Sequence, residues 1–68
     1  MEIDKILVKA LILKYEGEIA AAKANIQVYL KQSVGIGEHT DILSEIDKWL
    51  NSYSQAEENL VTLNKLCK

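Results

Sequence analysis

Apolar residues recur at alternating spacings of three and four along two long stretches of the chain. In the first stretch the series is Val8, Ile12, Tyr15, Ile19, Ala22, Ile26, Tyr29. In the second it is Ile42, Ile46, Trp49, Tyr53, Ala56, Leu60, Leu63, Cys67, with Leu43, Leu50 and Leu66 widening it. We call each series the seam of its helix. The spacing is typical of one helical stripe and predicts helices over residues 3–33 and 40–66.

The two predicted helices are separated by Val34-Gly35-Ile36-Gly37, which holds two of the three glycines of a chain without proline. Gly35 suits the left-handed position that closes a helix, and Gly37 lets the chain reverse. Thr40 or Asp41 can cap the second helix. Because the connection is short, the helices must run antiparallel. The sequence therefore predicts an all-α fold, a single αα-hairpin domain over residues 1–68.

An antiparallel hairpin brings the seams together in a defined order. The expected neighbours are Tyr29 and Ile26 with Ile42 and Ile46, Ile19 and Ala22 with Trp49 and Tyr53, and Val8 and Ile12 with Leu60 and Leu63. Trp49 against the small Ala22 would be a large-to-small match.

The first helix carries a second apolar face on the side opposite its seam. We call it the outer face, and its residues are Ile6, Leu7, Ala10, Leu13, Gly17, Ala20, Ala21, Ala24 and Val28. The far side of the second helix is polar apart from Val61. A helix that is apolar on two sides is expected to be buried on two sides. Gly17 fits a close contact with another helix, a kink, or a glycine that is simply tolerated.

The outer face predicts an association, and two occupants fit it. A second copy would give a homodimer, completed as a four-helix bundle with the two first helices at its centre. A different protein would make the hairpin an adaptor or inhibitor. A third reading is attachment to a membrane surface through residues 3–13, with Lys5, Lys9 and Lys14 facing anionic lipid.

Composition excludes several function classes. The net charge is −2, and all eight basic residues are lysines, so the arginine that dominates phosphate and base contacts is missing and nucleic-acid binding is not expected. Cys67 is the single cysteine, which excludes a disulfide within the chain. The start lacks the basic region of a signal peptide, and the apolar run at residues 6–13 is too short to span a bilayer. We expect a cytoplasmic protein without a membrane span.

Candidate chemistry is sparse. Gly35-x-Gly37 follows a helix rather than a strand, which is the wrong context for a phosphate-binding loop. The only cluster of potential ligands is His39 with Glu38, Asp41 and Glu45, and a second histidine for a typical zinc site is missing. We therefore expect Gly35, Ile36, Gly37, Glu38 and His39 to form a turn, with a metal site at His39 as a minor alternative.

Reactive and aromatic side chains also fit structural roles. Cys67 falls on the seam and is expected to be a small apolar filler. Tyr15, Tyr29, Tyr53 and Trp49 are spaced as core residues with polar tips at the rim. No catalytic residue, cofactor or metal is predicted, and the chain is not expected to be an enzyme.

One stretch resembles known proteins. Val28-Tyr29-Leu30, then Val34-Gly35-Ile36-Gly37-Glu38-His39, then Asp41-Ile42 and Ile46-Asp47 are similar to small uncharacterised proteins of tailed bacteriophages. The resemblance covers the turn and its flanks, about a third of the chain. Those proteins carry proline at the position of Thr40, which suits the first residue of a helix. The resemblance implies a phage origin, with a role either in particle assembly or in binding a host factor.

Overall fold

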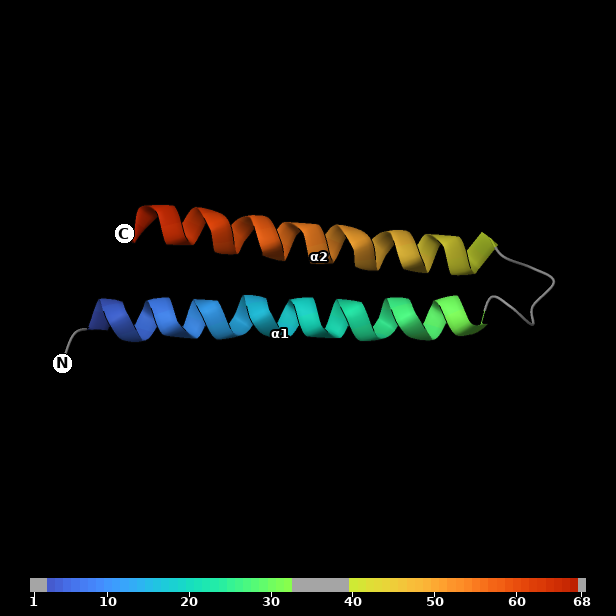
Figure 1. Ribbon diagram of the computed structural model, residues 1–68, viewed down its shortest axis with the longest axis horizontal. Helices are drawn as coiled ribbons and strands as arrows, with labels where there is room; N and C mark the ends of the chain where they lie inside the picture. The colour runs from blue at the N-terminus through green and yellow to red at the C-terminus, as the bar shows by residue number, and fades with distance from the viewer. Residues whose placement is uncertain (1–2, 33–39, 68) are drawn as a thin grey trace.

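The computed structural model describes residues 3–32 and 40–67 and consists of two helices packed as a hairpin (Figure 1). Helix α1 spans Ile3–Gln32 and helix α2 spans Thr40–Leu66. The described residues contain no strand. The all-α hairpin predicted from the seams is confirmed, and the helix bounds agree within one residue. The turn residues Gly35 to His39 lie outside the described ranges.

Charges at the helix ends agree with the direction of each helix. Asp4 and Asp41 lie in the first turns of α1 and α2, and Lys31 and Lys65 lie in the last turns. Acidic groups near a helix N-terminus and basic groups near its C-terminus interact favourably with the helix dipole, by about 0.3–1 kcal/mol each at exposed sites. Local electrostatics therefore support both helices, but tertiary contact has to supply most of their stability.

The molecule is a rod and has almost no enclosed core. Its principal extents are 55 × 18 × 12 Å and its radius of gyration is 15.8 Å. A compact domain of this length would have a radius of gyration of about 11 Å. Among the described residues, only Ala22 and Ala56 are fully buried, at 0% and 1% exposure. The remaining seam residues are half-buried, apart from Cys67, which is exposed.

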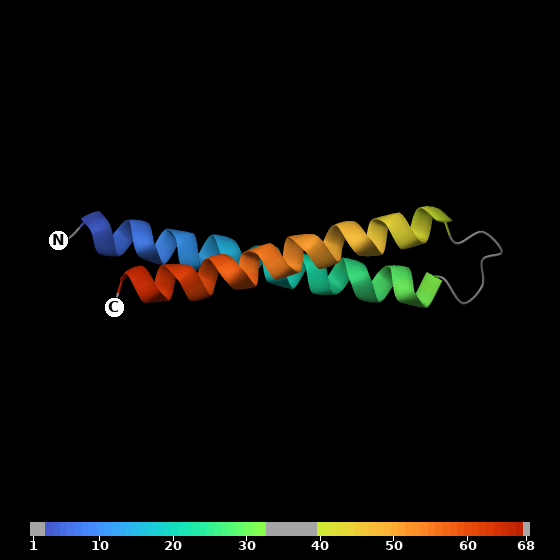
Figure 2. The same ribbon diagram turned by 90° about the horizontal axis from the view of Figure 1, so that it is seen from above.

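The two buried alanines lie near the middle of the two seams. Seen from above, α1 and α2 cross at a shallow angle near the middle of the rod (Figure 2). Small side chains at such a crossing let the helix axes approach, while larger seam residues fill the space on either side. Each seam therefore has its smallest side chain, an alanine, near its middle, and that alanine is buried against the other helix.

A cross-helix hydrogen bond fixes the register of the hairpin. The Tyr29 hydroxyl donates to Glu45 Oε1 at 3.3 Å. Near the other end of the rod, a cavity of about 210 Å³ is lined by Val8 and Ile12 of α1 together with Leu60 and Leu63 of α2. Both observations agree with the predicted antiparallel pairing. Extended along the helices, this register brings Ser52 to the level of Ala22, so Tyr53, rather than Trp49, is the nearest seam residue.

Candidate interaction surface

The outer face of α1 is exposed along its whole length. The half-buried or buried residues of α1 follow the seam toward α2, so the opposite side of the helix points away from the hairpin. Each predicted face residue is exposed: Ile6, Leu7, Ala10, Leu13, Gly17, Ala20, Ala21, Ala24, Val28. Leu13 and Val28 are 57% and 50% exposed, which is high for side chains of this size. The structure therefore places the predicted surface together on one side of one helix.

Charge is nearly absent from this face. Between residues 6 and 28, the positions turned away from α2 hold one charged side chain, Lys14. The Lys14 ammonium lies 5.4 Å from the centre of the Tyr15 ring, and Tyr15 belongs to the seam. The lysine head is therefore drawn toward the flank of the helix, where a cation over an aromatic ring is favourable. The middle of the outer face is left to small and apolar groups.

Gly17 lies in the middle of this face and is not required by the hairpin itself. A Cβ added at Gly17 would meet nothing within 4 Å. Helix α1 also continues through this position without interruption. An alanine there would favour the helix by about 0.5–1 kcal/mol. Within one chain, neither close packing nor a helix break explains the glycine.

Helix α2 exposes more apolar surface than its sequence pattern indicates. Leu43, Leu50 and Leu66 were expected to widen the seam, but all three are exposed, Leu66 by 78%. Two helices in contact cover only a narrow arc of each other, and residues beside that arc stay in solvent. The flanks of the seam on α2 therefore stay in solvent in the hairpin.

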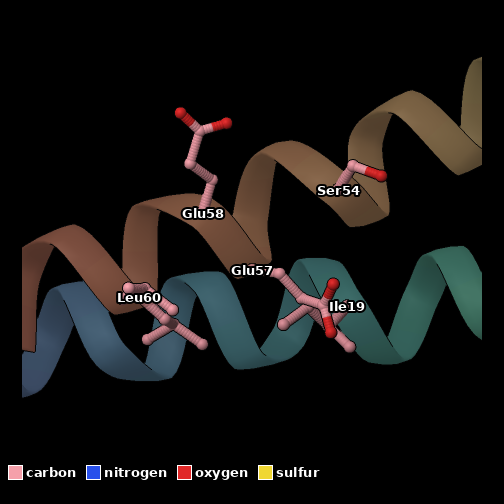
Figure 3. Close-up of a pocket in the computed structure, with 6 residues that line it drawn as sticks. Ile19, Ser54, Glu57, Glu58 and Leu60 are labelled. Carbon is pink, nitrogen blue, oxygen red and sulfur yellow. The ribbon is translucent and has the colours of Figure 1, made fainter.

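A shallow groove on one flank was not predicted. It has a volume of about 580 Å³ and is lined by Ile19, Ser54, Glu57, Glu58, Leu60 and Val61. Figure 3 shows Leu60 extending from α2 toward α1, while Glu58 points away from α1. In the sequence, the groove could have been inferred only from Val61, the one apolar residue on the far side of α2. Two carboxylates border the groove, so it is less apolar than the outer face.

The polar tips of the aromatic residues behave differently from one another. The Tyr29 hydroxyl is bonded to Glu45 at the edge of the seam, as expected for a rim position. The indole Nε1 of Trp49 is buried and has no hydrogen-bond partner in the described part of the chain, so its predicted rim position is wrong. The Lys48 ammonium lies 5.2 Å from the Trp49 ring centre, and it also pairs with Glu45 at 3.5 Å. These contacts hold the ring but leave its N–H unpaired.

The thiol and the potential metal ligands do not form a site within the described residues. Cys67 is exposed, although it borders the cavity formed by Val8, Ile12 and Leu63, so its expected role as a filler is only partly met. Over residues 3–32 and 40–67, no three His, Cys, Asp or Glu side chains converge as a metal site. His39 and the rest of the turn lie outside these ranges. In the same ranges, no helix is long and apolar enough to cross a membrane.

Comparisons with known proteins leave the surface as the main guide to function. Searches against family models, curated proteins and solved structures found no match to the chain. A functional interpretation therefore depends on the residues and their arrangement. The outer face of α1 is the feature with which such an interpretation starts, because the fold of one chain does not account for it.

Proposed function

We propose that the chain is a non-enzymatic protein–protein interaction module that self-associates through the outer face of α1. The observation that carries the proposal is that nine small or apolar side chains form one continuous face that the hairpin leaves in solvent. Contiguous exposed apolar surface on a helix is typical of an association site. Burying it in a dimer would give four helices with the two α1 helices at the centre.

The total surface area supports this proposal. The chain exposes 5395 Å² at a mass of 7.6 kDa. A compact monomer of that mass would expose about 4,300 Å². The excess is roughly 1,100 Å² per chain, and a standard protein interface buries about 800 Å² on each partner. One dimer contact of ordinary size would therefore bring the exposed area close to that of a compact protein.

A matched pair of variants tests the proposal. Ala24→Glu, or Ala20→Glu, puts a charge on the outer face of α1, where dimerisation would desolvate it. Asn51→Glu adds the same charge at an exposed position of α2. Size-exclusion chromatography with light scattering should give a monomer mass for the α1 variants and a dimer mass for Asn51→Glu. Equal masses for the two kinds of variant would count against the proposal.

A second candidate is that the outer face of α1 binds a host or phage protein instead of a second copy, which would make the hairpin an adaptor or inhibitor. The groove formed by Ile19, Leu60 and Val61 offers further apolar surface to such a partner. A phage origin is part of this proposal and derives from the resemblance of the turn sequence. A chain that stays monomeric and gains helical content only when a partner is added would favour this candidate.

A further inference from the structure

We propose that the two α1 helices of the dimer pack antiparallel about a two-fold axis that passes between Ala20 and Ala21. This proposal rests on the self-association proposed above and adds the arrangement of the partners. It assigns the outer face to a second copy of the same chain rather than to an unrelated protein. The order of residue types along the face, its charges and its single glycine carry the argument.

The part of the outer face from residue 13 to 28 reads the same in both directions from its centre. From residue 13 to 28, the side chains turned away from α2 are Leu13, Lys14, Gly17, Ala20, Ala21, Ala24, Gln27, Val28. In order, they are large apolar, long polar, then four small residues, then long polar and large apolar again. A two-fold contact requires a self-complementary patch, in which residue i meets residue j and residue j meets residue i. A different partner would not require this symmetry.

Antiparallel pairing about this centre matches side chains by size. Leu13 reaches the level of Val28 of the partner subunit, and Gly17 reaches the level of Ala24 of the partner subunit. In antiparallel helix pairs, such residues lie side by side in one layer of the contact. Large residues therefore close both ends of the contact, while small residues meet in the middle.

Charge complementarity selects the antiparallel orientation over the parallel one. In the antiparallel pair, Lys14 comes to the level of the uncharged Gln27 of the partner subunit. Glu16 comes within two residues, about 3 Å along the helix, of the level of Lys23 of the partner subunit on the same flank. A parallel pair in register would instead put Lys14 at the level of Lys14 of the partner subunit. Like charges in such a contact are unfavourable and opposite charges favourable.

The small residues set how closely the two backbones approach. Gly17 has open space around its missing Cβ in the hairpin, and Ala20, Ala21 and Ala24 surround it on the same exposed face. Helix axes are usually 8–10 Å apart, at a distance set by the side chains at the contact. Four small residues in a row favour the short end of this range. The dimer thereby gives the mid-helix glycine a role that the hairpin alone does not.

The position of the outer face also determines how four helices are arranged. It lies opposite the seam, so the partner's α1 approaches from the side away from α2. In a square bundle, the partner would instead cover a flank of α1, and both flanks carry charge: Lys9, Glu16 and Lys23 on one, Lys14 and Glu18 on the other. Burying these charges would carry a large desolvation cost. The proposed assembly is therefore a row of helices in the order α2, α1, α1, α2.

Thiol cross-linking of the 68-residue chain tests the arrangement. Cys67→Ser first removes the exposed native thiol. In that background, Ala21→Cys places two thiols next to the axis, where a short bis-maleimide can join them. The two copies of Leu13→Cys would lie about 22 Å apart along the helices, beyond the reach of the reagent. Mixing Leu13→Cys with Val28→Cys brings unlike thiols to the same level. Asn51→Cys on α2 is the control, and circular dichroism verifies that each variant is helical.

The proposal expects cross-linked dimer from Ala21→Cys alone and from the mixture of Leu13→Cys with Val28→Cys. It expects Leu13→Cys alone to give no more cross-linked dimer than the Asn51→Cys control. Strong self-linking of Leu13→Cys would mean a parallel pair and would overturn the proposal. A dimer mass without linking at Ala21→Cys would overturn the arrangement while leaving self-association intact. A monomer mass for the Cys67→Ser chain would contradict self-association itself.

Discussion

The Tyr29 hydroxyl donates a hydrogen bond to Glu45 Oε1 across the two helices, at 3.3 Å. The residues are 16 positions apart in the chain. Glu45 Oε1 also forms an ion pair with Lys48 Nζ, one turn later on α2, at 3.5 Å. A polar link between helices is directional, whereas contacts among half-buried apolar residues tolerate sliding. This link therefore helps to fix the register at the end of the hairpin that holds the turn.

Tyr29→Phe tests the contribution of this hydrogen bond. The phenylalanine keeps the ring in the seam and removes only the hydroxyl, so the free energy of unfolding should fall by about 1 kcal/mol. Tyr53→Phe is the control, because that ring also lies on the seam and its hydroxyl makes no hydrogen bond within the described part of the chain. Urea unfolding followed by circular dichroism measures both variants. An equal loss for the two would show that the Tyr29–Glu45 bond contributes nothing specific.

Ala56→Leu tests the close approach of the helices at the crossing. Ala56 is 1% exposed, so a leucine there must push α1 and α2 apart or move neighbouring side chains. Overpacking of this kind typically costs about 1–3 kcal/mol. Glu58→Leu adds the same side chain where α2 faces away from α1, and it should leave unfolding nearly unchanged (Figure 3). The melting temperatures of both variants are measured by thermal denaturation at matched concentration. Equal melting temperatures would show that the two helices are not in close contact at Ala56.

Gly17→Ala separates the stability of the helix from the strength of the dimer. In the isolated hairpin the new methyl group meets open space, so helix stability should rise by about 0.5–1 kcal/mol. In the dimer the same group lies between two backbones and should weaken association. The predicted result is a higher melting temperature at low concentration together with a larger dissociation constant. A tighter dimer would show that Gly17 is not at the contact.

Trp49→Phe tests whether the buried indole N–H is a cost to the fold. Its Nε1 is buried without a partner in the described part of the chain, and an unpaired buried donor costs about 1–3 kcal/mol. Phenylalanine loses some contact area but removes that donor, so we expect a net change below about 1 kcal/mol. Trp49→Ala loses the ring as well and should cost about 3 kcal/mol or more. Similar losses for the two variants, measured by chemical denaturation, would mean that the N–H is satisfied in solution.

The sequence was sufficient to predict the parts of the fold that depend on periodicity. The three–four spacing of Val8 to Tyr29 and of Ile42 to Leu63 located both helices and the faces that meet. The outer face of α1 followed from the same count, because positions opposite a seam are known once the seam is known. The occupant of that face does not follow from periodicity in one chain and remains a proposal.

Other features depend on distances that a residue pattern does not contain. Leu43, Leu50 and Leu66 lie next to the seam in sequence terms, but the contact between two crossing helices is too narrow to cover them. Trp49 was expected at the rim, yet the orientation of its ring buries the N–H. The choice of Tyr53 as the seam residue nearest to the level of Ala22 required the register that the Tyr29–Glu45 bond provides.

The central claim is that the outer face of α1 is covered by a second copy of the chain. The most direct test is the solution mass by light scattering after size exclusion, over about a hundredfold range of concentration, because association depends on concentration and folding of a monomer does not. The account predicts twice the 7.6 kDa of one chain throughout the upper part of that range. A monomer mass at every concentration would contradict it.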